Sequence, residues 1–239
     1  IIITAGIALM LSGVLGFLLY DVVEIRIAAW LLPWQDPSGS SYQIVQALIA
    51  FASGGIFGSG PGLGSPGFVP AAHTDFIYTA IGEEFGFIGI TLLITLFMIF
   101  LSRGLKTSAS QQEPFTRMLT SGITITLGLQ ALLIMGGNVR FLPLTGVTLP
   151  FMSYGGSSLL TSFACFGILV SLSAHNPARE VRPQDRLVHL GMMAGFVLLA
   201  FFTSLWSVFR APALAAREDN FRGFVESRFQ ERGAILDHK

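Results

Sequence analysis

The 239-residue chain is poor in cysteine and in charge. Its one cysteine, Cys165, excludes an intrachain disulfide and a metal site built from several cysteines. Asp, Glu, Lys and Arg make up 12% of the residues, roughly half the fraction of a soluble domain. Basic and acidic residues balance at 14 each, so there is no general basic surface for nucleic acid. The composition argues against a soluble globule and against a nucleic-acid partner.

Long apolar runs are present instead, and 52% of the residues are hydrophobic. Each run can hold the roughly 20 apolar residues that cross a bilayer as a helix. We therefore predict an all-α polytopic membrane protein with about five transmembrane helices. The predicted spans are 2–20, 76–102, 118–136, 156–174 and 188–209.

Basic residues alternate along the connectors between these spans. The connectors 103–117 and 175–187 each carry 3 Lys or Arg, whereas 21–75 and 137–155 each carry 1. By the positive-inside rule, the two richer connectors are cytoplasmic and the other two lie outside. An odd number of spans also places the tail 210–239 outside, despite its 6 basic residues, because the rule is weak for long translocated domains.

The connector 21–75 is a large extracellular loop rich in Gly, Pro and Ser. Residues 44–57 are apolar but too few to span a bilayer, so we expect them to lie in the interface or to re-enter the protein. The glycines of 54–67 permit close approach of backbone to a ligand. At membrane depth, such backbone persists only where protein or water satisfies its polar groups. A flexible extracellular turn is the alternative.

Acidic residues follow the glycines in FVPAAHTDFIYTAIGEEFG. Thr74 or Asp75 can cap the helix that begins here, and this is the structural interpretation of Asp75. Glu83 and Glu84 lie in a membrane helix, where carboxylates are costly and usually face a polar interior or a cavity. Adjacent helical positions point about 100° apart. We therefore expect one glutamate to hold a partner, such as Arg140 or a free backbone amide, and the other to face a cavity rim.

A second polar cluster is NVRFLPLTGVTLPFMSYGGSSLL. Pro143 and Pro150 bar a continuous helix, which predicts a broken, re-entrant segment. Two glycines and two serines then open the next span with free N–H groups and hydroxyls. Such a helix start is suited to a phosphate or pyrophosphate. An ordinary serine cap is the alternative.

GLGSPGFVPAAHTDFIYTAIGEEFGFIG and LPLTGVTLPFMSYGGSSLL resemble the SEDS proteins (FtsW, RodA and SpoVE), polytopic glycosyltransferases that polymerise lipid II into peptidoglycan. The resemblance covers about residues 1–176 and implies helices around a central cavity, with Asp75 as the catalytic residue. The chain begins at Ile1 and would hold the C-terminal part of a family member. Many members have Pro-Glu where this chain has Pro70-Ala71, and alanine can serve neither as an acid nor as a metal ligand.

The implied reaction joins an acceptor sugar hydroxyl to a lipid-linked pyrophosphate donor with inversion. Asp75 would act as general base, while Arg140 and the start of the span at 156 would stabilise the leaving pyrophosphate. A divalent cation (Mg²⁺ or Mn²⁺) could assist, but no metal ligands are assigned. Glu83 and Glu84 are supporting residues. The predicted substrate-binding residues are His73, Thr74, Arg140, Ser153, Tyr154, Gly155, Gly156, Ser157 and Ser158.

The tail AREDNFRGFVESRFQERGAILDHK resembles the opening of the class B penicillin-binding proteins. The resemblance implies four parts: 1–176 as the SEDS-like region, 177–187 as a cytoplasmic linker, 188–209 as a transmembrane anchor, and 210–239 as the start of an extracytoplasmic penicillin-binding-protein-like domain in cis. An amphipathic juxtamembrane helix is the alternative for the tail.

We thus expect a peptidoglycan glycosyltransferase of the bacterial inner membrane that acts on lipid II at the extracytoplasmic face and is coupled to a fused transpeptidase. The 239 residues alone, which would be only a piece of such a protein, are expected to be inactive. A lipid II flippase and a non-catalytic scaffold for a transpeptidase are the alternatives. The motifs do not distinguish elongation, division and sporulation.

Overall fold

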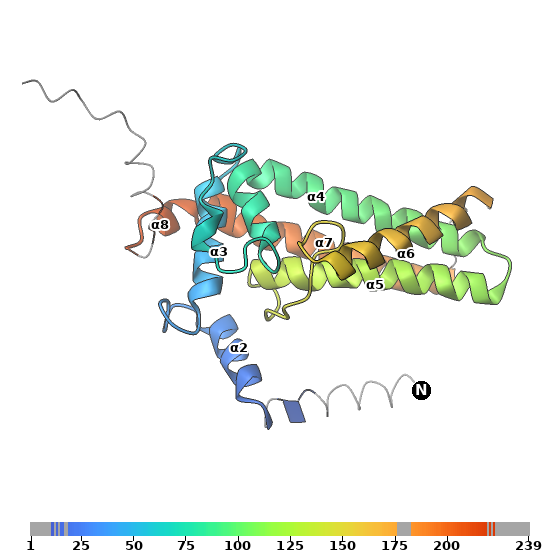
Figure 1. Cartoon of the computed structure of the whole chain (residues 1–239), viewed down its shortest axis with the longest axis horizontal. Coiled ribbons are helices and arrows are strands. Elements are labelled where there is room, and N and C mark those ends of the chain that lie inside the picture. The colour runs from blue at the N-terminus through green and yellow to red at the C-terminus, as the bar shows by residue number, and fades with distance from the viewer. Residues whose placement is uncertain are drawn as a thin grey trace, which may run out of the picture.

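The computed structural model describes residues 19–175 and 183–218, together with 11, 13, 15, 16, 220 and 222. All regular elements within these residues are helical, which confirms the predicted all-α class. Figure 1 shows the long helices α4 to α7 running along one another, with α3 across one end and α2 beyond it. The elements are α2 (Asp21–Leu31), α3 (Tyr42–Gly54), η1 (Pro66–Phe68), α4 (Ile77–Ser110), α5 (Pro114–Asn138), α6 (Gly156–His175), α7 (Pro183–Ser204), η2 (Leu205–Phe209) and α8 (Ala211–Ala215).

Four described helices are long and apolar enough to cross a membrane. They are Ile77–Ser110, Pro114–Asn138, Gly156–Ala174 and Arg186–Phe209, and they confirm four of the predicted spans. The fifth predicted span, 2–20, lies almost entirely outside the described residues. The tail beyond residue 218 lies outside them too, apart from residues 220 and 222.

The predicted connector 103–117 is wrong in its extent. α4 continues to Ser110, so Arg103 and Lys106 lie on the helix, and α5 begins at Pro114. No proline lies between 103 and 110 to stop the helix, and long basic side chains can reach water from a helix end. Helix α7 likewise begins at Pro183, inside the predicted linker 177–187, because proline is favoured in the first helical turn.

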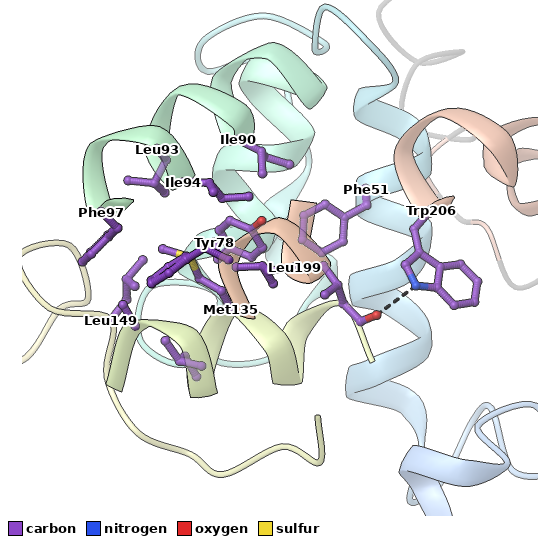
Figure 2. Packing of buried hydrophobic residues seen from close by; sticks show 14 of the residues in the cluster. Phe51, Tyr78, Ile90, Leu93, Ile94, Phe97, Met135, Leu149, Leu199 and Trp206 are labelled. Atoms are coloured by element: carbon purple, nitrogen blue, oxygen red, sulfur yellow. Dashed lines mark hydrogen bonds between the residues drawn. The ribbon is translucent and has the colours of Figure 1, made fainter. Parts of the chain in front are cut away.

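Helix α3 re-enters the protein rather than lying at its surface. Every residue from 44 to 52 is buried, and the helix packs against α4, α8 and η2. Figure 2 shows Phe51 of α3 beside Tyr78 of α4 and Leu199 of α7. The rings of Phe51 and Tyr78 meet edge to face at 5.5 Å, and the Tyr78 hydroxyl lies 2.9 Å from Oγ1 of Thr203. Lipid is as apolar as these side chains, so close packing and paired polar groups stabilise this arrangement.

Helix α4 is interrupted at Gly86, whose φ of 64° and ψ of −165° are non-helical. The interruption frees backbone groups on both sides, and residues 55–67, here called the Gly-rich loop, pair with them. The hydrogen bonds are Ser59 N–H to Glu83 O (2.9 Å), Gly60 N–H to Glu84 O (3.0 Å), Phe87 N–H to Gly55 O (2.9 Å) and Ile88 N–H to Ile56 O (3.2 Å). The loop is therefore held as part of the fold, and the flexible turn is not what the structure shows.

Candidate active site

Asp75 lies in a tight turn directly before α4. The N–H groups of Thr74, Asp75 and Phe76 all donate to the carbonyl of Ala71, at 3.0, 3.1 and 3.3 Å. Ala71 has a φ of 56°, in the left-handed region. The N-cap of α4 is Phe76, and no side-chain cap bond is made there. Within the described part of the chain the half-buried Asp75 carboxylate is thus not engaged as a helix cap.

Arg26 of α2 faces the same space as Asp75, above Gly146. Oδ2 of Asp75 lies 3.7 Å from the point that a Cβ on Gly146 would occupy, and both Nη atoms of Arg26 lie 3.9 Å from that point. Nη1 of Arg26 also approaches the carbonyls of Leu144 and Thr145, at 3.4 Å each. The sequence interpretation missed Arg26, although it is the one basic residue of 21–75.

The two motif segments meet at this point. The N–H of Tyr154 donates to the carbonyl of His73 at 2.8 Å, and their rings lie 5.9 Å apart. The Ser153 hydroxyl donates to the carbonyl of Thr74 at 2.6 Å and accepts from the N–H of Leu149 at 2.7 Å. Ser153 is 1% exposed, so its hydroxyl joins the two segments, whereas the His73 and Tyr154 side chains are exposed.

Asn138 ties Asp75 to the end of α5. Its Nδ2 donates to the carbonyls of Asp75 and Ile134, at 2.9 and 3.0 Å, and its Oδ1 accepts from Thr79 Oγ1 at 3.0 Å. Asn138 is fully buried. The sequence interpretation did not select it, although an amide at the end of an apolar span is the signal that could have found it.

Arg140 holds the C-terminal end of α2. Its Nε and Nη2 donate to the carbonyls of Trp30 and Leu31, at 2.7 and 2.8 Å, which are among the last carbonyls of that helix. Burial, and then the charge of Arg210, lowers the pKa of Arg140. The guanidinium remains charged even so, because its usual pKa is far above neutrality. The expectation that Arg140 pairs with a glutamate of α4 is wrong.

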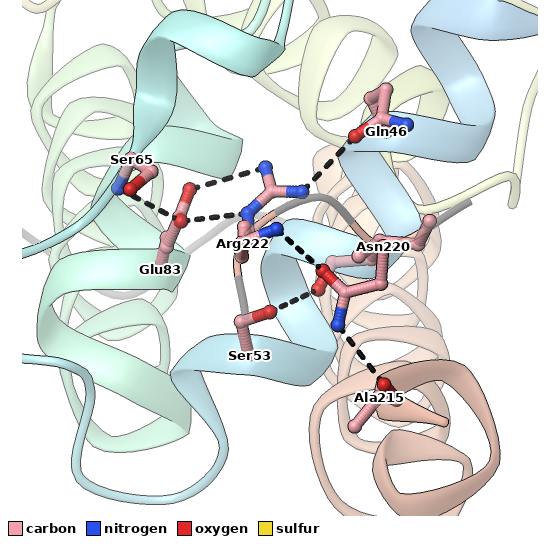
Figure 3. Close-up of polar contacts among 8 residues, drawn as sticks. Gln46, Ser53, Ser65, Glu83, Ala215, Asn220 and Arg222 are labelled. Atoms are coloured by element: carbon pink, nitrogen blue, oxygen red, sulfur yellow. Dashed lines mark hydrogen bonds and ion pairs between the residues drawn. The ribbon is translucent and has the colours of Figure 1, made fainter. Parts of the chain in front are cut away.

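Glu83 pairs instead with Arg222 and with a backbone amide. Nε of Arg222 lies 2.8 Å from Oε1 of Glu83, and the N–H of Ser65 donates to the same oxygen at 2.9 Å. Figure 3 shows the Glu83 carboxylate between these two groups. Glu84 is half-buried, and its Cγ lies 3.0 Å from the point that a Cβ on Gly64 would occupy. A free backbone amide was expected for one glutamate, but Arg222 was not.

The start of α6 borders a groove of about 610 Å³ between α5 and α6. The Ser158 hydroxyl lies 2.6 Å from Oγ1 of Thr148, whose carbonyl accepts from Nε2 of Gln130 at 2.9 Å. Polar side chains along the groove are Thr126, Gln130, Ser157, Ser158, Thr161 and Ser162. Gly155 and Gly156 precede these serines at the helix start. Among the described residues, no group of three His, Cys, Asp or Glu is placed to hold a metal ion.

The cell cycle protein family of FtsW, RodA and SpoVE matches residues 1–178. The chain belongs to this family. It is 44% identical over 182 residues to the peptidoglycan glycosyltransferase RodA of Mycobacterium tuberculosis, covering 76% of this chain and 39% of that protein. It is 40% identical over 183 residues to RodA of Mycobacterium leprae, with 75% and 39% covered. It is 43% identical over 166 residues to the "Probable peptidoglycan glycosyltransferase FtsW" of Geobacter metallireducens, with 66% and 44% covered.

The chain spans about two fifths of the length of these FtsW and RodA relatives. The family match includes both motif segments, Arg26, Asn138 and Arg140. It ends before α7, so α7, η2, α8 and Arg222 lie beyond the matched region.

Proposed function

We propose that the chain contributes the catalytic carboxylate of a peptidoglycan glycosyltransferase that polymerises lipid II. The observation that carries the proposal is the Asp75 carboxylate, which makes no capping bond to α4 and faces Arg26 across Gly146. A general base must lie within hydrogen-bond reach of the proton it takes and be partly shielded from water. The half-buried setting of Asp75 meets the second requirement.

In the proposed reaction, Asp75 accepts the proton of the acceptor sugar hydroxyl as its oxygen attacks the anomeric carbon of the donor. The new glycosidic C–O bond forms on the face opposite the breaking C–O bond, which gives inversion. The electron pair of the breaking bond leaves with undecaprenyl pyrophosphate. The proton then passes from Asp75 to water, which restores the base.

The leaving pyrophosphate needs cationic or N–H donors. Arg26 is exposed beside Asp75, and in the part of the chain that the structure describes only Nη1 of its guanidinium donates hydrogen bonds, so we assign Arg26 the role of cationic donor to the pyrophosphate. Arg140 holds the end of α2, the helix that carries Arg26, and thereby fixes the position of the Arg26 backbone. The helix start at 156, with Ser157 and Ser158, is the second donor group.

The segment beyond the family match suits the proposed fusion to a class B penicillin-binding protein. Arg186–Phe209 has the length and composition of a membrane span, and α7 packs against α4 and α5. An anchor that packs on the catalytic helices would keep an extracytoplasmic transpeptidase beside the emerging glycan. On this proposal, 21–75, 137–155 and the tail all lie on the extracytoplasmic face of the bacterial inner membrane.

The test uses the full-length protein purified in detergent and incubated with lipid II. We expect glycan chains on gels, release of undecaprenyl pyrophosphate, and a product that a muramidase specific for β-linked glycan digests. In liposomes, a flippase would instead move unaltered lipid II between leaflets without making polymer. Translocation without polymer would favour the transporter and contradict the proposed function.

A further inference from the structure

A buried ion pair joins the tail to α4. The Arg222 side chain is 7% exposed and that of Glu83 is 2% exposed. Nε of Arg222 lies 2.8 Å from Oε1 of Glu83, and Nη2 lies 3.4 Å from Oε2. Nη1 donates to Oε1 of Gln46 in α3 at 3.1 Å, and the ring of Phe68 lies 5.6 Å from Cζ. Every nitrogen of this guanidinium therefore has an acceptor, in the fork geometry that arginine alone provides.

The position of Arg222 is itself tied to α8, the short helix that follows the span Arg186–Phe209. The N–H of Arg222 donates to Oδ1 of Asn220 at 3.2 Å, and Nδ2 of Asn220 donates to the carbonyl of Ala215 in α8 at 3.1 Å. Figure 3 shows these contacts running from Ala215 through Asn220 to the backbone N–H of Arg222, whose guanidinium meets Glu83 and Gln46. Asn220 and Arg222 are therefore held at a defined point of the fold, although they lie beyond the region that the family match covers.

Glu83 is the meeting point of the tail and the Gly-rich loop. Its carboxylate accepts from the N–H of Ser65, and its backbone carbonyl accepts from the N–H of Ser59. The side chain thus has two partners, one cationic and one from the loop. If Arg222 were removed, a buried carboxylate would be left without its countercharge, and water would have to enter or the segment would have to move.

The same contacts bear on Asp75. Residues 77–85 form a short segment of α4 before the break at Gly86. Because the helix is interrupted there, other contacts must set the direction of this segment. Asp75 lies two residues before this segment, and Glu83 is near its end. We propose that Arg222 is a positioning residue, which acts through Glu83 to hold the Gly-rich loop and residues 77–85 in the arrangement that places Asp75. The effect on catalysis rests on the proposed function, whereas the effect on the loop does not.

The first readout is independent of activity. Amide hydrogen exchange is measured on the Gly-rich loop of the full-length protein and of an Arg222→Ala variant. We expect exchange there to become faster by about tenfold or more, which is within the usual range of coupling between sites. Arg210→Ala is the matched control, because Arg210 is an exposed arginine of the same tail that stacks on Trp206. It should leave exchange in the loop unchanged.

A second variant protects the test against simple misfolding. Adding Glu83→Gln to Arg222→Ala removes the unpaired buried charge but keeps an oxygen that can accept the Ser65 N–H. We expect this double variant to exchange more slowly in the loop than Arg222→Ala alone. Arg222→Lys keeps the charge but not the fork, so its exchange rate should fall between those of the wild type and Arg222→Ala.

The second readout is lipid II polymerisation. We expect Arg222→Ala to lower kcat by about tenfold with a smaller change in KM, and Glu83→Gln to restore part of kcat. Faster loop exchange with unchanged kcat would overturn the positioning role, as would unchanged exchange in Arg222→Ala. If the wild type made no polymer, the proposed function would fail, and the exchange measurements would still decide whether Arg222 holds the loop.

Discussion

Gly86→Ala should strongly destabilise the protein, because the break in α4 depends on this glycine. Its φ of 64° is in the region that costs alanine about 1–3 kcal/mol. A Cβ there would also overlap the backbone nitrogen of Gly58 and the carbonyl of Ile56, so the Gly-rich loop would have to withdraw. Each hydrogen bond between loop and helix contributes roughly 0.5–1.5 kcal/mol. Strain and the loss of two such bonds together predict destabilisation of about 2–6 kcal/mol.

The assay is thermal unfolding of the full-length protein in detergent, with circular dichroism as the signal that monitors loss of helix. Gly191→Ala in α7 is the matched control, because nothing lies within 4 Å of the Cβ it would add. An alanine in a helix interior is favoured over glycine by about 1 kcal/mol, so the control should be neutral or slightly stabilised. If Gly86→Ala unfolded at or above the temperature of Gly191→Ala, the reasoning about the interrupted helix would be refuted.

Three further predictions concern the site and the topology. Asn138→Ala should destabilise the protein by about 1–3 kcal/mol, because it leaves the buried Thr79 hydroxyl without its acceptor. It should also lower polymerisation. Wild-type stability in the same unfolding assay would contradict the predicted destabilisation. Arg26→Ala should raise the KM for the lipid-linked donor, and Arg26→Lys should recover part of the loss as a point charge; an unchanged KM would remove Arg26 from the pyrophosphate site. A cytoplasm-active reporter inserted after Gln112 and a periplasm-active reporter fused after Lys239 should both give signal, and a cytoplasmic signal from the second position would contradict the topology.

Four of the five spans could be predicted from the sequence and confirmed, because a bilayer requires a minimum length and an apolar composition of each helix that crosses it. The break at Gly86 could not be predicted, since glycine is common in membrane helices and the backbone groups that flank the break pair with residues 55–60 of a separate loop. The extension of α4 to Ser110 is not apparent from hydropathy, because Arg103 and Lys106 end the charge-free run although the helix continues. Hydropathy sets where a helix can cross, whereas long-range backbone pairing sets where it bends.

In the candidate site, too, the sequence identifies a local motif but not the contacts between distant segments. The motifs pointed to Asp75, and the structure adds the contacts that surround it. Asn138 and Arg222 are far from Asp75 and Glu83 in the sequence, and neither forms part of a local pattern that predicts its partner. Arg140 was one of the two partners expected for a glutamate of α4, the other being a free backbone amide. Its actual partners are backbone carbonyls of α2, which sequence pattern alone does not identify.

The most direct test of Asp75 as the general base compares Asp75→Asn with Asp36→Asn in the full-length protein. Both substitutions replace a carboxylate of the same connector by an amide of equal size, but Asp36 lies in an exposed turn with Ser40. The measurement is the amount of lipid II polymer made by each variant at matched membrane expression. We predict that Asp75→Asn inserts normally and makes no polymer, while Asp36→Asn polymerises as the wild type does. Near-normal polymer from Asp75→Asn would contradict the proposed mechanism.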